Sequence, residues 1–281
     1  MPEPLLALRD AELTLGGRVL WSGLDLDVRP GEFMAVLGAN GSGKTSLLKT
    51  VLGQHRLSAG SATFLGGDIR HGDRRIGYVP QQRVWPRGTP MLGRDLVTLG
   101  RTGSRWGIPI TGREDREAVA KAIWAVRAES LAARPVGDLS GGEQQRLRIA
   151  QAIVDEPSLL LLDEALSSLD LAHQAEILGL VARERARGAA VLFIAHDVNP
   201  ILDRVDRILY LARGRHRLGS PDEVLTSAVL SELYGTRVDV LRVADPEDAS
   251  RQRVFVAGVG DAHDHHLEEH AEQLEHLERS E

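Results

Sequence analysis

The stretch GANGSGKT, residues 38–45, constrains the fold of this chain more than any other feature. It has the pattern G-x-x-x-x-G-K-[ST]. It follows the continuous apolar run EFMAVLG and precedes SLLKTVLG, whose apolar residues recur at helical spacing. A glycine-rich loop between a buried strand and a helix presents successive backbone N–H groups at a positive helix end, which attracts anions. The sequence therefore predicts a phosphate-binding loop within an α/β fold.

The loop supplies side chains as well as backbone N–H groups. We expect Lys44 to reach the β- and γ-phosphates of a nucleoside triphosphate and Thr45 to bind Mg²⁺. ATP and Mg²⁺ are therefore the expected cofactors. The residues expected to contact the nucleotide are Gly38, Ala39, Asn40, Gly41, Ser42, Gly43, Lys44, Thr45 and Ser46.

Two more apolar runs predict buried parallel strands, SLLLLD at 158–163 and AAVLFIAHD at 189–197. Each ends in ionisable residues, and the carboxyl ends of parallel strands meet at one edge of a sheet. We therefore expect a single composite site. Asp163 is expected to hold Mg²⁺ through water, Glu164 to reach an attacking water, and His196 to hydrogen-bond the γ-phosphate.

A second glycine-rich stretch, LSGGEQQR, begins about a hundred residues after the first. Its serine and the glutamate three residues later predict a capping box at the start of a helix. Glycine is a poor helix former, so two glycines in a first helical turn indicate a place where a ligand approaches the backbone closely. Because residues 38–45 already hold the chain's own ATP, we expect this helix start to bind the γ-phosphate of ATP on a second copy. The residues concerned are Leu139, Ser140, Gly141, Gly142 and Glu143.

Together these motifs resemble those of the ATP-binding subunits of ABC transporters, over about residues 5–226. In this resemblance GANGSGKT is the Walker A motif, LLLLDE is Walker B and LSGGEQQR is the signature. It implies that Glu164 is the catalytic carboxylate and His196 the switch histidine. Gln81 in GYVPQQ resembles the Q-loop glutamine, a further contact of the Mg²⁺ site, with Gln82 as the alternative. Asp170 in SSLD resembles the D-loop aspartate that faces the opposite subunit.

The expected fold class is α/β: a P-loop NTPase ABC cassette with a parallel core sheet, an N-terminal antiparallel β-subdomain and an inserted helical subdomain. We interpret residues 1–225 as the nucleotide-binding domain, with the helical insertion at about 82–140. Residues 226–260 are interpreted as a helix and hairpin extension, in which RVDVLRV and RVFVAGV pair. Residues 261–281 form an acidic, histidine-rich tail, expected to be disordered or a short helix.

The sequence departs from the family pattern at two positions. An aromatic residue usually stacks on adenine near the end of the first strand. Here Leu15 occupies that place, and Trp21 follows six residues later. Stacking on the base should therefore be weaker. Ala165 also replaces the usual proline after the catalytic glutamate, from which we expect little consequence.

The tail contains eight Asp or Glu residues, one Arg and five of the ten histidines of the chain. If it is helical, His263, His266 and His270 share one face and could bind a metal ion tetrahedrally. Incidental histidines in a solvated acidic segment are the alternative. A metal bound there would be sensed or buffered, since the transported substrate would pass through a separate permease.

Composition limits the compartment and the partners. The chain has no cysteine, a net charge of −6 and 4% aromatic residues, which argues against disulfides and against a nucleic-acid partner. No apolar run approaches the roughly 18 residues of a membrane helix. We therefore expect a peripheral subunit at the cytoplasmic face of the membrane. Its expected partners are a second identical subunit, integral-membrane permease subunits and, indirectly, an extracytoplasmic solute-binding protein.

The resemblance also indicates a substrate. One cassette per chain with a short helical insertion is typical of bacterial importer ATPases, and IGYVPQQR, DLVTLG and VLSELYG are most similar to the zinc and manganese importer branch. Siderophore, haem or cobalamin import is the alternative. A soluble ABC ATPase acting on nucleic acid or ribosomes is the alternative of a different class, but such proteins carry long coiled-coil insertions or two cassettes. A simple P-loop kinase would not need the signature.

Overall fold

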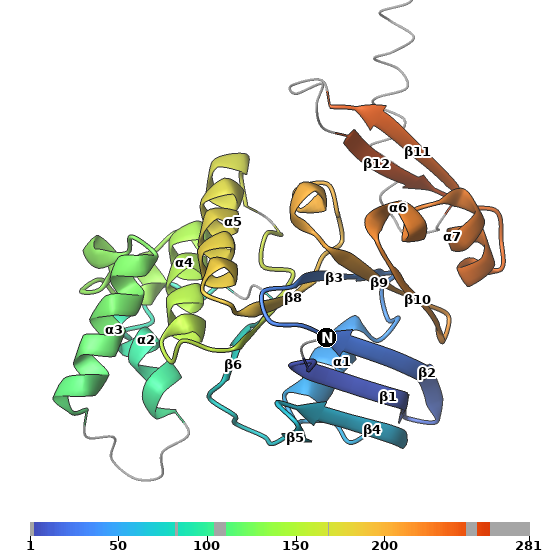
Figure 1. Ribbon diagram of the computed structural model, residues 1–281. Coiled ribbons are helices and arrows are strands. Elements are labelled where there is room, and N and C mark those ends of the chain that lie inside the picture. Colours follow the sequence, from blue (N-terminus) through green and yellow to red (C-terminus); the bar gives the residue numbers. More distant parts are fainter. Residues whose placement is uncertain (1–2, 82–83, 104–110, 168, 246–251, 259–281) are drawn as a thin grey trace, which may run out of the picture.

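The computed structural model describes residues 3–258 except 82–83, 104–110, 168 and 246–251. Its centre is a six-stranded sheet in the order β10-β9-β3-β8-β7-β6 (Figure 1). The strands β6, β7, β8, β3 and β9 run parallel, and β10 pairs with β9 in the antiparallel sense. In chain order they span Phe33–Gly38 (β3), Ile76–Val79 (β6), Leu159–Asp163 (β7), Ala190–Ile194 (β8), Arg207–Ala212 (β9) and Arg215–Gly219 (β10).

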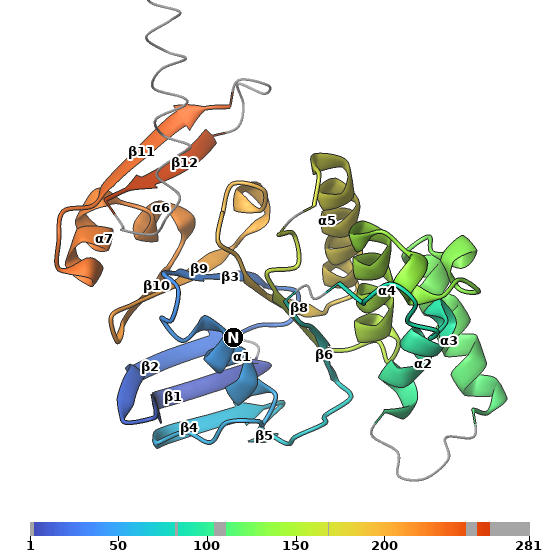
Figure 2. The same cartoon turned by 180° about the vertical axis from the view of Figure 1, so that it is seen from behind.

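A second, antiparallel sheet lies against one face of the first, with helix α1 (Lys44–Val51) between them (Figure 2). Its order is β2-β1-β4-β5. Alternation of apolar and polar residues turns one side of β1 inward. The turn between β1 and β2 is made by two glycines with positive φ, as the Gly-Gly pair at 16–17 predicts. The strands span Leu6–Leu15 (β1), Arg18–Val28 (β2), Ala59–Phe64 (β4) and Gly67–Asp68 (β5).

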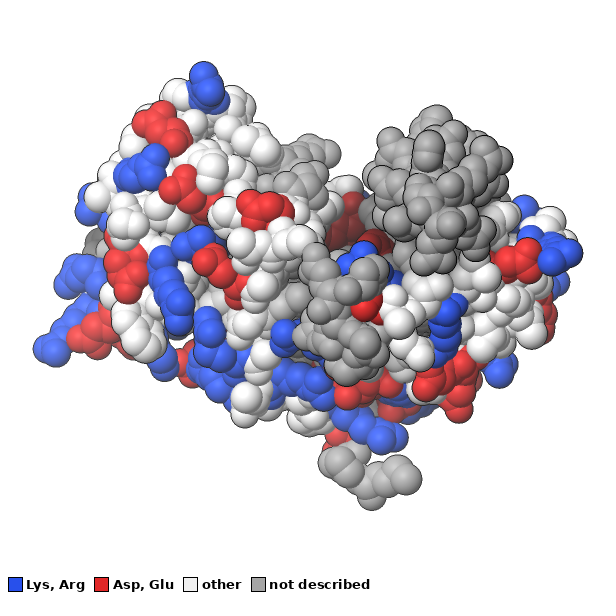
Figure 3. Space-filling view, turned by 90° about the horizontal axis from the view of Figure 1, so that it is seen from above, with Lys and Arg blue, Asp and Glu red and all other residues white. Residues whose placement is uncertain are grey.

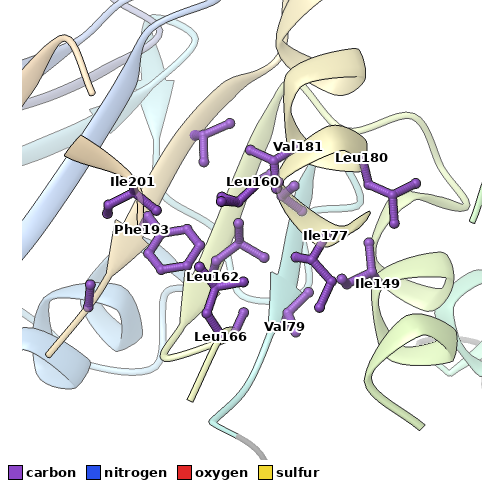
Figure 4. Packing of buried hydrophobic residues seen from close by; sticks show 14 of the residues in the cluster. Val79, Ile149, Leu160, Leu162, Leu166, Ile177, Leu180, Val181, Phe193 and Ile201 are labelled. Carbon is purple, nitrogen blue, oxygen red and sulfur yellow. The ribbon is translucent and has the colours of Figure 1, made fainter. Parts of the chain in front are cut away.

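Helices α4 (Gly141–Ile153) and α5 (Leu171–Ala186) pack against the other face of the central sheet. Figure 4 shows how the apolar side chains of the strands meet those of α5 and α4: Leu160 lies beside Val181, and Ile177 lies beside Ile149 and Val79. The strands β7 and β8 are therefore buried on both faces, which is why their sequences are continuous apolar runs.

The helical subdomain consists of α2 (Gly93–Thr102), α3 (Arg113–Ala125) and the start of α4. Short 3₁₀ turns at Glu129–Leu131 and Val136–Asp138 connect α3 to α4. The sequence indicated mostly helical structure from about residue 82. Of the residues described, helix begins only at Gly93, because Pro86 and Pro90 disfavour helical conformation in the residues before them.

The chain continues through a 3₁₀ turn at Leu202–Arg204, and after β10 through α6 (Pro221–Val224) and α7 (Ser227–Tyr234). The strands β11 (Asp239–Ala244) and β12 (Gln252–Ala257) then pair as an antiparallel hairpin. In both views this hairpin lies on the opposite side of the central sheet from β1, β2 and β4 (Figures 1 and 2).

Basic and acidic side chains are interspersed on the face seen from above, where the described surface is not dominated by one sign of charge (Figure 3). The longest helix described, α5, has 16 residues. None of the described helices combines the length and the hydropathy that crossing a bilayer requires.

One largely buried cation ties the helical subdomain to the sheet. The Arg101 guanidinium on α2 donates to Asp155, just before β7, at 2.6 Å and to Asp115 on α3 at 3.0 Å. Both carboxylates are nearly buried, and Asp155 is also held by Arg74 through two 2.6 Å bonds. These ion pairs therefore link α2, α3 and the segments that precede β6 and β7.

We expect Arg101→Met to lower the free energy of unfolding by about 3 kcal/mol, because it removes one cation from two nearly buried carboxylates, Asp115 and Asp155. Urea denaturation of both proteins measures this. Arg113→Met is the matched control, since Arg113 pairs with Glu117 at the surface, 88% and 64% exposed, and should change stability only slightly. Equal effects of the two substitutions would contradict a structural role for the Arg101 cluster.

Candidate functional site

A cavity of about 460 Å³ opens at the carboxyl ends of the parallel strands. The glycine-rich loop after β3 forms one wall, and residues following β6, β7 and β8 form the other. Four segments distant in the sequence are thereby brought together at one edge of the central sheet, as expected from the strand ends, and Leu20 of β2 adds to them from the antiparallel sheet. The lining residues are Leu20, Asn40, Gly41, Gly43, Lys44, Thr45, Ser46, Gln81, Glu164 and His196.

Glycine is required at three positions of the loop, for different physical reasons. A Cβ atom at Gly38 would lie 2.0 Å from the backbone oxygen of Leu211, and one at Gly43 would lie 3.0 Å from the Trp21 ring. Gly41 has φ +73° and open space around it. The first two glycines therefore let the loop pack tightly against the sheet, and the third lets the backbone turn where it faces the cavity.

Lys44 is folded back over the loop in this structure. Its ammonium donates to the backbone oxygens of Gly38 and of Ala39, the latter at 3.0 Å. The loop carbonyls thus hold the cation at the mouth of the anion site, where a phosphate oxygen could replace them as its partner. Ser42, also expected to contact the nucleotide, has its side chain turned inward, 7% exposed.

Asp163 ends β7 with a nearly fully buried carboxylate whose Oδ1 lies 3.5 Å from the Thr45 hydroxyl. Burial raises the pKa of Asp163, and the negative charge of Glu164 raises it further. A hydroxyl and a carboxylate on facing elements are the oxygen ligands that Mg²⁺ prefers. The donor set at this point therefore fits that cation.

Tyr78 on β6 was not identified from the sequence as a site residue. It lies on the same face of the sheet as Leu161 and Asp163, because residues two apart on a strand share a face. Burial, the charge of Asp163 and the contact of its carboxylate with the Tyr78 hydroxyl raise the pKa of Tyr78 to about 12. Tyr78 is therefore a neutral group whose hydroxyl can donate to the Asp163 carboxylate.

Glu164 stands between two partners. Gln81 donates to its Oε2 at 2.6 Å, and Nε2 of His196 lies 2.6 Å from its Oε1. Its backbone has φ +51°, an uncommon conformation for a residue with a side chain, and its N–H donates to the Ile194 carbonyl at 3.0 Å. The structure therefore brings together Gln81, Glu164 and His196, which come from three different strand ends. Gln82, the alternative Q-loop residue, lies outside the described residues.

The signature stretch begins α4 with the expected capping box. The N–H of Glu143 donates to the Ser140 hydroxyl at 3.3 Å, and the Ser140 N–H donates to the Glu143 carboxylate at 2.7 Å. Arg134 contacts the same carboxylate at 3.1 Å. Gly142 faces the His173 ring, which a Cβ would approach to 2.9 Å. The described lining of the cavity includes no residue from 139 to 143, so this helix start lies away from the chain's own phosphate loop.

Asp170 begins α5. Its carboxylate accepts from the His173 N–H at 2.9 Å and lies 2.8 Å from the His173 ring nitrogen Nδ1. Leu171, the next residue, is 76% exposed. The expected D-loop aspartate is therefore a helix N-cap next to an exposed apolar side chain, near the signature helix.

Two buried glutamines in the signature stretch connect parts of the site. Gln144 accepts from the Trp85 N–H at 2.8 Å and donates to the carbonyls of Val136 and Leu139 at 3.0 and 3.2 Å. Gln145 donates to the carbonyl of Ala165 at 3.2 Å. The segment after Gln81, the signature and the Walker B end are thus joined through α4. The stretch was recognised from its glycines, and these glutamines were not singled out.

The structure separates the two residues considered for adenine. Trp21 is wholly buried against Gly43, whereas Leu15 at the end of β1 is 37% exposed. Of the two, only Leu15 can contact a base. The proposed tail ligands His263, His266 and His270 lie outside the described residues.

Comparison with known proteins agrees with this geometry. The family model described as "ABC transporter" matches residues 21–167. The manganese transport system ATP-binding protein MntB of Halalkalibacterium halodurans is 32% identical over 73% of this chain and 82% of its own length. The zinc import ATP-binding protein ZnuC of Pseudomonas savastanoi is 32% identical over 86% of each chain. The hemin import ATP-binding protein HmuV of Pseudomonas entomophila is 37% identical over 86% of this chain and 96% of its own.

Solved structures give the same result. A metal-chelate type ABC transporter in an inward-facing conformation has a chain that is 26% identical, with a TM-score of 0.77, covering 92% of this chain and 99% of its own. The family match spans more than half of the chain, and it includes the phosphate loop, the signature and the Walker B end of the site. The chain therefore belongs to the ABC transporter family and is one of its ATP-hydrolysing ATP-binding cassettes.

Proposed function

We propose that this cassette powers a bacterial importer of Zn²⁺ or Mn²⁺, as a homodimer that closes head to tail on two ATP molecules. The observation that carries the proposal is the meeting of Lys44, Thr45, Glu164 and His196 around one cavity, with the Asp163 carboxylate beside Thr45. A phosphate-binding loop, a carboxylate for the metal and a second carboxylate for water are the parts that ATP hydrolysis requires.

Each of these residues has a role in hydrolysis. Lys44 exchanges its loop carbonyls for β- and γ-phosphate oxygens. Mg²⁺, which neutralises phosphate charge when bound, would be held by Thr45 and Asp163, with Gln81 as the Q-loop contact. Glu164 orients a water and accepts its proton as the water oxygen bonds to the γ-phosphorus. The bond from that phosphorus to the β,γ-bridging oxygen breaks, and ADP leaves with the electron pair. His196, at the adjacent strand end, donates a hydrogen bond to the γ-phosphate.

A second copy supplies what the cavity lacks. The capped start of α4 is an anion site by its helix dipole and its serine hydroxyl, and it lies outside the cavity of its own chain. Head-to-tail pairing brings this helix start over the partner's ATP. Asp170 and the exposed Leu171 next to it would then lie at the contact between copies. Closure on ATP and opening after hydrolysis is the resulting power stroke.

The substrate assignment rests on similarity and on the tail. MntB and ZnuC are named for manganese and zinc, and the five histidines after residue 260 offer a place where such an ion could be sensed. Haem import is the second candidate, favoured by the 37% identity to HmuV and by the likeness to a metal-chelate type transporter. In either case, permease subunits at the membrane would carry the substrate, with this chain bound at their cytoplasmic face.

The Mg²⁺ site gives a first prediction. Tyr78→Phe removes the hydroxyl that holds Asp163, and we expect about tenfold weaker binding of the metal. Mn²⁺ bound in the presence of ATP can be counted by paramagnetic resonance, and the Mg²⁺ dependence of ATPase activity gives a second readout. Tyr234→Phe is the matched control, because its hydroxyl lies 3.2 Å from that of Tyr210 in the core, away from the cavity. Unchanged metal binding in Tyr78→Phe would show that Thr45 alone orients Asp163.

The dimer gives a second prediction. Glu164→Gln should bind ATP but not hydrolyse it, and it should therefore accumulate as an ATP-bound dimer in size-exclusion chromatography with light scattering. In the double variant that also carries Ser140→Arg, the larger side chain keeps the γ-phosphate of the partner's ATP from reaching the start of the signature helix. The double variant should bind ATP with unchanged Kd and stay monomeric. A double variant that dimerises as well as Glu164→Gln would mean that the signature stretch is only a helix cap.

The substrate gives a third prediction. Cells of the source organism that carry Glu164→Gln should lose uptake of radiolabelled Zn²⁺ or Mn²⁺ while uptake of labelled haem is unchanged. Because the substitution stops turnover without removing the protein, the loss reports transport rather than assembly. Loss of haem uptake with normal uptake of both ions would assign the chain to haem import instead.

A further inference from the structure

The C-terminal hairpin is attached to the loop that carries His196. The Asn199 side chain accepts from the backbone N–H of Val254 at 2.7 Å and donates to the backbone carbonyl of the same residue at 3.0 Å. Both backbone groups of Val254 thus point away from β11 and pair with one amide. Asn199 therefore takes the place of a neighbouring strand at the outer edge of β12.

The loop itself is held in a fixed shape. Oδ1 of Asp197 accepts from the backbone N–H of Asn199 at 2.9 Å and from its side-chain amide at 2.8 Å. The amide nitrogen of Asn199 thereby uses one hydrogen for Asp197 and the other for Val254. The three residues after His196 and the middle of β12 form one hydrogen-bonded unit.

Packing reinforces this unit. Val254 is 4% exposed and belongs to the main core cluster, together with Val198 and Ile201 from the loop, which are 7% and 1% exposed. A two-stranded hairpin has little stability of its own in water. The contact with the loop after His196 therefore helps to hold β12 in place, and β12 in turn covers the apolar side chains of that loop.

His196 precedes this unit directly, and its side chain is 43% exposed. Because the His196 ring is this exposed, its position depends mainly on the backbone to which it is attached. Its Nε2 lies 2.6 Å from Glu164, so a small backbone displacement would change the distance between the two groups that face the γ-phosphate.

We propose that Asn199 and β12 form a clamp through which the C-terminal hairpin positions His196 and thereby sets the rate of ATP hydrolysis. The inference rests on the role of His196 given under the proposed function. The hairpin lies beyond residues 21–167, which the family model matches, so this chain controls turnover with an element outside that match. Asn199 is a positioning residue in this view, since it acts on the phosphate through His196.

The test compares substitutions in the full-length chain. Asn199→Ala removes the clamp from the loop side, and Val254→Asp displaces β12 by placing a charge in its buried position. Both should lower kcat about tenfold with KM for ATP and ATP binding unchanged, and together they should lower it no further. Hydrogen exchange at the Val254 N–H should accelerate in Asn199→Ala.

Ser231→Ala is the matched control. The Ser231 hydroxyl likewise accepts from and donates to one backbone residue, Val238, at 2.9 and 3.2 Å, and it anchors the same extension away from His196. It should keep nearly full kcat. Equal losses in Ser231→Ala and Asn199→Ala would overturn the proposal, because any loosening of the extension would then suffice. A normal kcat in Val254→Asp would overturn it as well, since Asn199 would act through Asp197 alone.

His196→Ala separates this proposal from the one on which it rests. Loss of hydrolysis in His196→Ala with normal kcat in Asn199→Ala means that the histidine has its proposed role and the clamp does not. Full activity in His196→Ala contradicts the role of the histidine itself. Faster exchange at Val254 in Asn199→Ala would in that case show that the hairpin docks without controlling turnover.

Discussion

The parallel pairing of β3, β8, β7 and β6 is the constraint on which the rest of the molecule depends. The strands β7 and β8 are buried on both faces, so their ionisable groups occur where the strands end. The pairing brings the ends together, and with them the phosphate loop, the Asp163–Glu164 pair and His196. The chemistry of the site is therefore a consequence of a register fixed by apolar side chains some distance away.

The same arrangement gathers ionisable groups whose charges a bound nucleotide and its metal would balance. Asp163 is almost wholly buried and carries a raised pKa, because burial and the adjacent Glu164 both disfavour its negative charge. Lys44 is turned toward its own loop, and Glu164 contacts Gln81 and His196. A nucleotide with its metal would give Lys44 phosphate oxygens, and Asp163 a cation, as partners of opposite charge. Binding energy from the nucleotide thus offsets the cost of gathering ionisable groups at one sheet edge.

The sequence predicts the parts of this site that local chemistry determines. A phosphate loop, a capping box and continuous apolar strands are each readable within about ten residues, and the fold class follows from their order. Tyr78, Asn199 and the buried position of Trp21 are not readable in this way. Tyr78 meets Asp163 only because β6 lies next to β7, and Asn199 meets a residue 55 positions later in a hairpin that no local pattern connects to it. Contacts of this kind depend on strand order, which one sequence does not state.

The signature helix presents an apparent conflict that its neighbours resolve. An anion site at a helix start should avoid a carboxylate, yet Glu143 lies in the first turn of α4. Its carboxylate is turned back onto the Ser140 N–H, and Arg134 lies 3.1 Å from it. Although burial acts in the opposite direction, these contacts lower the pKa of Glu143, so its charge is retained and balanced by Arg134. The carboxylate therefore fixes the shape of the loop while the arginine cancels its repulsion, and the positive end of the helix dipole can still face the phosphate of a second chain.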